Sequence, residues 1–228
     1  MSVFLTGDIH GDPTRLLNIP DENLTKKDIF IVLGDFGIIW KKDRAMRQLE
    51  ALGSKNFTVA FVDGNHENFD LIEELELPLD WNGGKVGYLP FGIIHLKRGE
   101  VYTIEGKTFG ICGGADSIDK WMRNEGTSWW PQETLTADSA QLLIDNAKDK
   151  TLDFILTHDC PQTFIGFMKA LGGINSIDKY TETQINLQKI YDNVKCKNWY
   201  FGHWHMNIPI AASKCHMECL YDNIKEII

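Results

Sequence analysis

Short, almost wholly apolar runs that end near a glycine recur in the first third of the chain. They span residues 3–5, 28–33 and 57–62. Strands that are covered on both faces of a sheet have this pattern, whereas strands with one wet face alternate apolar and polar residues. The pattern therefore predicts three buried strands in a sheet that helices cover.

The segments between these runs repeat their apolar residues at helical spacing. Residues 41–54 carry Ala45, Met46, Leu49 and Leu52, and residues 67–77 carry Phe69, Leu71, Ile72 and Leu75. Glu67 is expected in the first turn of the second helix, where a carboxylate is favoured. Strand and helix thus alternate at the start of the chain.

The middle of the chain changes character. Residues 85–114 hold short alternating segments with many glycines, which predict antiparallel hairpins. Residues 132–148 and 183–194 are predicted helices, residues 152–156 a buried strand, and residues 199–220 further strands. The apolar face of the helix 132–148 is expected to consist of Leu135, Leu142, Leu143 and Ala147.

Together these elements predict an α/β (α+β) fold in which a two-sheet β-sandwich is flanked by helices. The chain has no internal repeat and no linker-like stretch, so a single domain over residues 1–228 is expected. With 43% hydrophobic and 24% charged residues, the composition is that of a globular protein and excludes a disordered chain or a disulfide scaffold.

Charge and hydropathy narrow the classes of partner. The 23 Lys and Arg residues against 32 Asp and Glu residues give a formal net charge of -9, so a long nucleic acid is not an expected partner. No apolar run approaches the roughly 20 residues that span a bilayer, and the N-terminal residues lack a basic signal. The expectation is a cytoplasmic protein with reduced thiols and no membrane partner. The oligomeric state is left open.

A polar cluster follows each of five predicted strands. The clusters are Asp8-Ile9-His10, Gly34-Asp35, Gly64-Asn65-His66, Thr157-His158-Asp159 and His203-Trp204-His205. Carboxylate, imidazole and amide oxygen are metal ligands, and a spacing of two residues in an extended segment puts both side chains on one side. One such cluster alone is typical of a turn, but five clusters at five strand ends favour a metal site.

In their order along the chain, these clusters resemble the motifs of the calcineurin-like metallophosphoesterase superfamily of binuclear metal phosphoesterases. Asp-x-His, Gly-Asp, Gly-Asn-His-Glu, a later His and a final Gly-His-x-His follow one another over residues 5–205. The resemblance implies the helix-flanked sandwich. It also implies a hydrolase that cleaves a phosphate ester by attack of a metal-bridging hydroxide.

The resemblance further implies two divalent metal ions that share one carboxylate. One ion would be held by Asp8, His10, Asp35 and His205. The other would be held by Asp35, Asn65, His158 and His203. His66 would face the substrate and assist the leaving group, so that His66 and Asp35 are the expected catalytic residues. Ligation by oxygen and nitrogen without thiolate suits manganese, which is expected first, and also iron, zinc or cobalt.

The second motif departs from that of the protein Ser/Thr phosphatases, which continue it as Gly-Asp-x-x-Asp-Arg-Gly. Here Phe36-Gly37-Ile38-Ile39-Trp40 follows Asp35, without the second Asp and the Arg. The expected substrate is therefore a small phosphodiester or a nucleotide. The alternatives are a phosphoprotein or other phosphomonoester phosphatase, and a catalytically inactive protein-binding scaffold, which is disfavoured because every ligand role has a matching residue.

Residues 113–130 form a segment between the third and fourth motifs that is expected to influence substrate choice. Arg123 is a candidate to bind a phosphate together with Asn65 and His66, since the cation of motif two is missing. An equal alternative is that Arg123 belongs to a plain surface loop. Trp129 and Trp130 are expected to pack against the sandwich.

Overall fold

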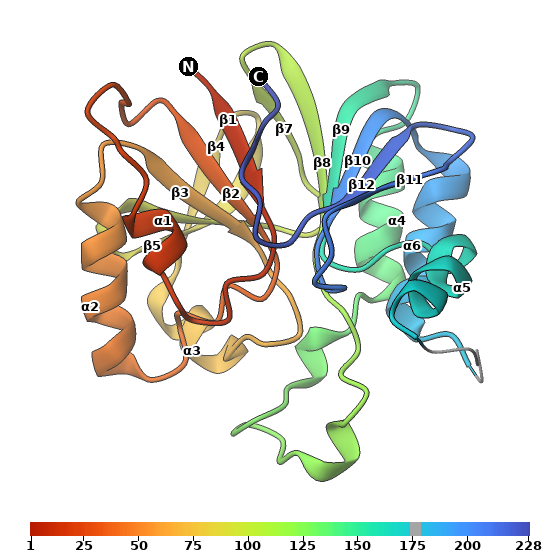
Figure 1. Cartoon of the computed structure of the whole chain (residues 1–228), viewed down its shortest axis with the longest axis horizontal. Helices are drawn as coiled ribbons and strands as arrows, with labels where there is room; N and C mark the ends of the chain where they lie inside the picture. The colour runs from red at the N-terminus through yellow and green to blue at the C-terminus, as the bar shows by residue number, and fades with distance from the viewer. Residues whose placement is uncertain (174–178) are drawn as a thin grey trace.

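The computed structural model describes residues 1–173 and 179–228. Its strands form two sheets that pack face to face, with helices on both outer sides (Figure 1). The first sheet has the order β13-β1-β2-β3-β6-β5-β4, and the second has the order β11-β12-β10-β9-β8-β7. This arrangement is the helix-flanked sandwich that the sequence predicts.

The strands are β1 Val3–Thr6, β2 Ile29–Leu33, β3 Thr58–Val62, β4 Leu77–Trp81, β5 Gly84–Leu89, β6 Ile93–Leu96, β7 Val101–Ile104, β8 Lys107–Cys112, β9 Thr151–Thr157, β10 Lys195–Phe201, β11 Ile208–Ile210, β12 His216–Cys219 and β13 Lys225–Glu226. The helices are α1 Thr14–Leu17, α2 Lys42–Gly53, α3 Phe69–Leu75, α4 Ala137–Asn146, α5 Gln162–Leu171 and α6 Glu182–Asn193. Short 3-10 helices are η1 Pro90–Gly92, η2 Lys120–Met122 and η3 Pro131–Glu133. Within the described ranges, every helix is too short or too polar to traverse a bilayer.

Strand β2 explains why the early strands are apolar throughout. Ile31 and Leu33 point into the cluster between the two sheets, whereas Phe30 and Val32 point into the cluster under the helices of the first sheet. Since successive side chains of a strand alternate between faces, a strand with a core on each side has no position for a polar residue. A third cluster packs α4, α5 and α6 on the second sheet.

The predicted hairpins are present, but they belong to different sheets. Strands β5 and β6 pair antiparallel in the first sheet, and β7 and β8 pair antiparallel in the second. Strand β6 is also parallel to β3, and β8 is also parallel to β9. The chain therefore crosses from one sheet to the other between β6 and β7, which the sequence pattern did not indicate.

Two details predicted for the helix 132–148 are wrong, namely the residue at which it begins and one residue of its apolar face. Helix α4 begins at Ala137, after Thr136 accepts a hydrogen bond from the backbone N–H of Ser139 and thereby caps the helix. The buried side of this helix runs through Ala140 and Leu143. Leu142 lies two positions beyond Ala140, so it points away from the core and is 44% exposed.

Candidate metal centre

The five polar clusters meet at one end of the sandwich. Strands β1, β2 and β3 run parallel in one sheet and β9 and β10 run parallel in the other, so their carboxyl ends share one edge. All seven predicted ligands lie there: Asp8, His10, Asp35, Asn65, His158, His203 and His205. Six of them, together with His66, form overlapping groups whose ligand atoms lie within 4.8 Å, namely Asp8 with His10 and His205, His10 with Asp35 and His66, and Asp35 with His158 and His203.

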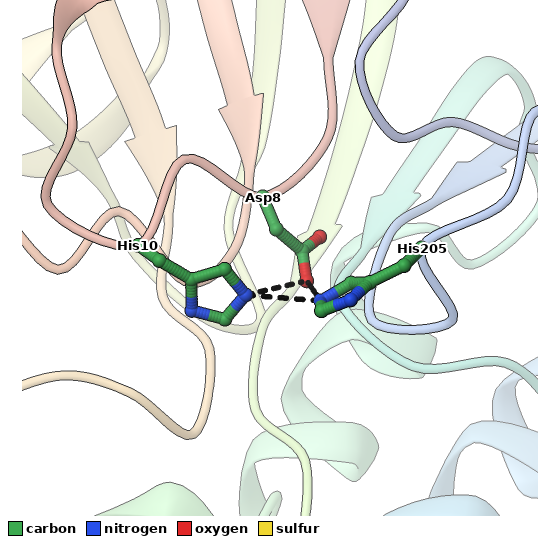
Figure 2. Close-up of side chains that lie close together, drawn as sticks. All are labelled: Asp8, His10 and His205. Atoms are coloured by element: carbon green, nitrogen blue, oxygen red, sulfur yellow. Dashed lines mark hydrogen bonds and ion pairs between the residues drawn. The ribbon is translucent and has the colours of Figure 1, made fainter.

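Figure 2 shows the first group, which brings Asp8 and His10 from the start of the chain next to His205 from its last part. Oδ2 of Asp8 lies 3.1 Å from Nε2 of His205 and 3.7 Å from Nε2 of His10, and the two nitrogens are 2.9 Å apart. This Oδ2 atom is buried without a hydrogen bond, while Oδ1 accepts one from the backbone N–H of His203. An unpaired buried carboxylate oxygen costs about 1–3 kcal/mol or more. A carboxylate oxygen facing two imidazole nitrogens therefore fits a divalent cation.

Asp35 stands between this group and the next. Its Oδ2 lies 3.7 Å from Nδ1 of His10, and its Oδ1 lies 3.2 Å from Nε2 of His158. Burial alone would raise the pKa of this carboxyl, but the charge of His158 and its hydrogen bond outweigh burial and hold the pKa far below its usual range. Asp35 is therefore an ionised carboxylate with one oxygen turned toward each group.

His158 is the most enclosed of the predicted ligands. Its Nδ1 donates a hydrogen bond of 2.8 Å to the carbonyl of Leu33, which leaves Nε2 facing Asp35 and, at 3.3 Å, Oδ1 of Asn65. Burial opposes its charged form, but the carboxylates of Asp35 and Asp8 raise the pKa of His158 to about 10. Without a metal ion, His158 is therefore a positively charged imidazolium. Its protonated Nε2 occupies the position expected for a ligand nitrogen.

The backbone of the predicted ligands is locally strained. Four of the eight non-glycine residues with positive φ in the described chain are His10, Asp35, His203 and His205. This conformation costs on the order of 1 kcal/mol or more for a side chain of such size and concentrates at functional sites. All four residues lie in the turns that follow β1, β2 and β10.

The glycines before the motifs leave room for the ligands. A Cβ atom on Gly34 would lie 2.0 Å from Nδ1 of His158, and one on Gly64 would lie 2.2 Å from Oδ1 of Asp35. Gly34 also has a φ of +88°. A larger residue at either position would displace a predicted ligand, so these glycines serve the site as well as the turn.

Ser117 and Glu133 support Asn65, and sequence reasoning missed both. The amide of Asn65 donates to Oγ of Ser117 over 3.2 Å, and Ser117 donates to Oε2 of Glu133 over 2.6 Å. Oε1 of Glu133 is buried without a partner, and burial raises the pKa of this carboxyl to about 7. In the sequence, the only indication of a role for Ser117 was its position in the segment 113–130.

Glu67 is the second supporting residue, and its predicted place in a helix is wrong. Helix α3 begins at Phe69 behind the cap Asn68, so Glu67 precedes it and is fully buried. Its two carboxyl oxygens accept hydrogen bonds from the backbone N–H groups of Phe36, at 2.7 Å, and Gly37, at 3.1 Å. Glu67 thus holds the turn that follows Asp35. Asn68, a residue type that often caps helices, could have indicated from the sequence that the helix begins after Glu67.

Arg98 ties the strand end before Asn65 to η3 and to the residue that follows it. Its Nε donates to Oδ2 of Asp63 over 2.7 Å, and its other nitrogens donate to the carbonyls of Gln132 and Thr134, each over 2.8 Å. Burial opposes the charge of Asp63, but Arg98 and His95 together outweigh burial and keep the pKa of Asp63 well below its usual range. No sequence motif pointed to Arg98.

The predicted substrate-binding residues share one cavity, which we call the metal-side cavity. It measures about 340 Å³, and its lining includes Asp35, Asn65, His66, His203 and Arg123. Nε of Arg123 lies 2.8 Å from a carboxylate oxygen of Asp119, and Nη1 donates to the carbonyl of Ser128. Arg123 therefore faces the same space as His66, and it is held there by its own loop.

Of the two tryptophans of this segment, Trp130 packs as expected. It is 2% exposed and donates from Nε1 to Asp70 of α3 over 2.9 Å. Trp129 is half-buried, with the Lys120 ammonium 5.9 Å from its ring centre. The segment projects from the end of the sandwich opposite the termini (Figure 1), and the hydrogen bond of Trp130 to Asp70 anchors it to α3.

Comparison with known proteins agrees with this geometry. The sequence profile described as calcineurin-like phosphoesterase matches residues 1–207. The chain belongs to this family. The calcineurin-like phosphoesterase profile thus covers every predicted ligand. As a member, the protein is a metal-dependent phosphoesterase, and the groups around Asp8, Asp35 and His158 are its candidate metal-binding residues. The comparison with curated proteins found no match.

Solved structures share the fold of this calcineurin-like phosphoesterase. The protein TT1561 of Thermus thermophilus is 10% identical with a TM-score of 0.55, and the match covers 99% of this chain and 97% of that one. A candidate 5′-nucleotidase of Staphylococcus aureus is 13% identical with a TM-score of 0.51. That match covers 99% of this chain and 50% of the larger protein. At such identities the likeness concerns the fold alone.

Proposed function

We propose that this protein is a binuclear phosphoesterase that hydrolyses a small phosphodiester or a nucleotide. One ion would be held by Asp8, His10, Asp35 and His205. The other would be held by Asp35, Asn65, His158 and His203. The single observation that carries this proposal is the position of Asp35, whose two carboxylate oxygens face different groups of histidines.

The metal ions and His66 have different roles in the proposed hydrolysis. When bound, the divalent ions supply positive charge for the phosphate and activate the attacking water. Burial lowers the pKa of His66, so its imidazole is neutral near pH 7 and carries one proton that it can donate in a hydrogen bond to the leaving oxygen. Its ring centre lies 5.1 Å from that of His10, at the edge of the site.

Arg123 is proposed to hold a non-bridging phosphate oxygen. The support is its place in the metal-side cavity together with Asn65 and His66. The guanidinium is oriented by Asp119 and Ser128, and two contacts leave donors of its planar fork for a ligand. In this role Arg123 would replace the arginine that motif two lacks.

Manganese is the metal we propose first, because the ligands are oxygen and imidazole nitrogen without thiolate. We also propose that residues 1–228 form one domain. The support is the apolar cluster between the sheets, to which Ile31 of the first sheet and Leu156 of the second both belong. A cytoplasmic location remains a prediction from the sequence.

Metal removal and return test the proposed function. The protein is stripped with a chelator and assayed with 4-nitrophenyl phosphate and bis(4-nitrophenyl) phosphate, with and without manganese. We expect activity to vanish on stripping and to return with the metal. Full activity after stripping would overturn the proposal. The preferred compound separates monoester from diester hydrolysis.

The Asp35→Asn variant tests the bridging carboxylate. It keeps the shape of the side chain but removes the charge, so kcat/KM should fall by about 100-fold or more. Asp43→Asn is the matched control, because Asp43 is exposed on α2 and lines neither side of the site. Equal activities of the two variants would contradict the role given to Asp35.

A further inference from the structure

A second cavity adjoins the metal-side cavity, and the two share a wall. It measures about 440 Å³ and is lined by His10, Gly11, Gly37, Ile38, Trp40, Lys41, Arg44 and His66. We call it the cationic cavity. His10 and His66 line both cavities, so a molecule bound at the proposed metal ions can extend past His66 into this space. Its volume is within the range of small-molecule sites, about 300–1,000 Å³.

The charges of the cationic cavity are unusual for this protein. The chain has a formal net charge of -9, yet the lining contains Lys41 and Arg44 and no carboxylate. In the described chain, the side chain of Lys41 has no hydrogen bond and no ion pair. The carboxylate of nearby Asp12 does not line the cavity and accepts a hydrogen bond from the backbone N–H of Thr14. An unpaired cation in such a wall suits an anionic ligand.

Contacts with neighbouring residues hold Arg44 and the apolar side chains of the lining in place. Nη2 of Arg44 donates to the carbonyl of Gly11 over 3.2 Å, which sets the direction of the guanidinium and leaves its other donors unused. Ile38 is buried. Trp40 is fixed from behind by Trp130, with ring centres 5.4 Å apart and nearly perpendicular planes. An indole next to two cations can bind a ligand that has a flat or apolar part and a negative charge.

We propose that the cationic cavity binds the leaving group of the substrate, and that this group carries a second anionic substituent beside a flat or apolar part. The inference rests on the proposed function. Hydrolysis adds water across the ester, so the attacking oxygen bonds to phosphorus, the bond from phosphorus to the ester oxygen breaks, and the released alcohol takes a proton. Since His66 faces the leaving oxygen, the alcohol lies on the side of His66 that opens into the cationic cavity.

Two aryl phosphates of equal reactivity test the subsite. The probes are 4-(carboxymethyl)phenyl phosphate and its methyl ester, which differ in one charge far from the scissile bond. In the manganese-loaded wild type, kcat/KM should be about tenfold higher for the acid than for the ester, mainly through KM, since a bound charge gains about 1.4 kcal/mol. A wild-type ratio of one or less would overturn the inference.

Three variants locate the effect. Lys41→Ala and Arg44→Ala should each lower the ratio of acid to ester, and Lys41→Ala removes no side-chain hydrogen bond or ion pair. Arg47→Ala is the matched control, since Arg47 is exposed on α2 and does not line the cavity. We expect it to keep the wild-type ratio. If it lowers the ratio as much as Arg44→Ala does, the effect is one of overall charge and the subsite is refuted.

Binding of the product gives a readout that needs no turnover. Saturation-transfer NMR should detect 4-hydroxyphenylacetate on the wild type and a weaker signal on Arg44→Ala. If neither the two aryl phosphates nor bis(4-nitrophenyl) phosphate is hydrolysed after metal return while this binding difference is present, the proposed function fails and the anion subsite stands. If both compounds are hydrolysed at equal rates and the product binds both proteins alike, only the subsite fails.

Discussion

The side-chain amide of Asn65 donates a hydrogen bond to Oγ of Ser117, 3.2 Å away, and this contact links a predicted metal ligand to a loop 52 residues further along the chain. Ser117 is buried and donates in turn to Glu133. Because the amide nitrogen is engaged, Oδ1 of Asn65 is turned toward His158. The segment 113–130 therefore helps to orient the proposed second metal site.

Ser117→Ala should weaken metal binding. Without the hydroxyl, the amide of Asn65 loses the contact that fixes its orientation, and loss of such support costs about 10- to 100-fold in metal affinity. Calorimetric titration of the metal-free protein with manganese measures the change. Ser128→Ala, in the same loop, removes the hydrogen bond that Ser128 accepts from the backbone N–H of Asn124, which does not involve Asn65, and is the control. Equal affinities of both variants would contradict the orienting role.

Glu133 should make stability depend on pH. Burial raises the pKa of its carboxyl from 4.5 to about 7, so between these values the folded protein holds a proton that the unfolded chain releases. The free energy of unfolding then falls as pH rises through this window, by less than about 1.4 kcal/mol per pH unit, and the contribution is fully lost above pH 7.

Glu133→Gln should remove this contribution, since the amide does not titrate. Urea unfolding of the metal-free protein at pH 5.0 and pH 7.5 measures it as a difference between wild type and variant, which should favour the variant at the higher pH. Glu125→Gln, at an exposed position of the segment 113–130, should follow the wild type. Parallel changes in wild type and E133Q would show that Glu133 does not titrate in this range.

Gly34→Ala should disturb both the fold and the site. Its Cβ would lie 2.0 Å from the His158 imidazole, and φ is +88°. We expect a loss of about 2–4 kcal/mol in the free energy of unfolding and weaker manganese binding. Gly106→Ala is the matched control, because Gly106 has a φ of +71° but nothing within 4 Å of its Cβ. It should lose about 1 kcal/mol from backbone strain alone.

Glu67→Ala should destabilise the turn after Asp35. The substitution leaves the backbone N–H groups of Phe36 and Gly37 without their acceptor, and an unpaired buried donor costs about 1–3 kcal/mol. Thermal unfolding monitored by circular dichroism measures the loss. Glu73→Ala, at an exposed position of α3, should change the midpoint little. A midpoint equal to that of the control would refute the supporting role of Glu67.

The class of fold and the residue types of the site could be predicted from the amino-acid sequence alone. Apolar runs such as 28–33 indicate the doubly covered strands, because a strand with a core on each side has no polar position. Asp8 and His10, and likewise His203 and His205, indicate ligands because their spacing and chemistry are local properties of the chain. Both kinds of signal are contained in a few neighbouring residues.

The residues that support the site became visible only once the chain was folded. Ser117 and Arg98 look like ordinary loop residues, and their roles come from contacts across 52 and 35 residues of chain. Glu67 was assigned to a helix because its neighbours are helical, yet its burial against Phe36 depends on how two strands are paired. The cationic cavity likewise exists because the turn after Asp35 and the start of α2 pack beside His10. Such relationships depend on packing between distant segments, which no local pattern records.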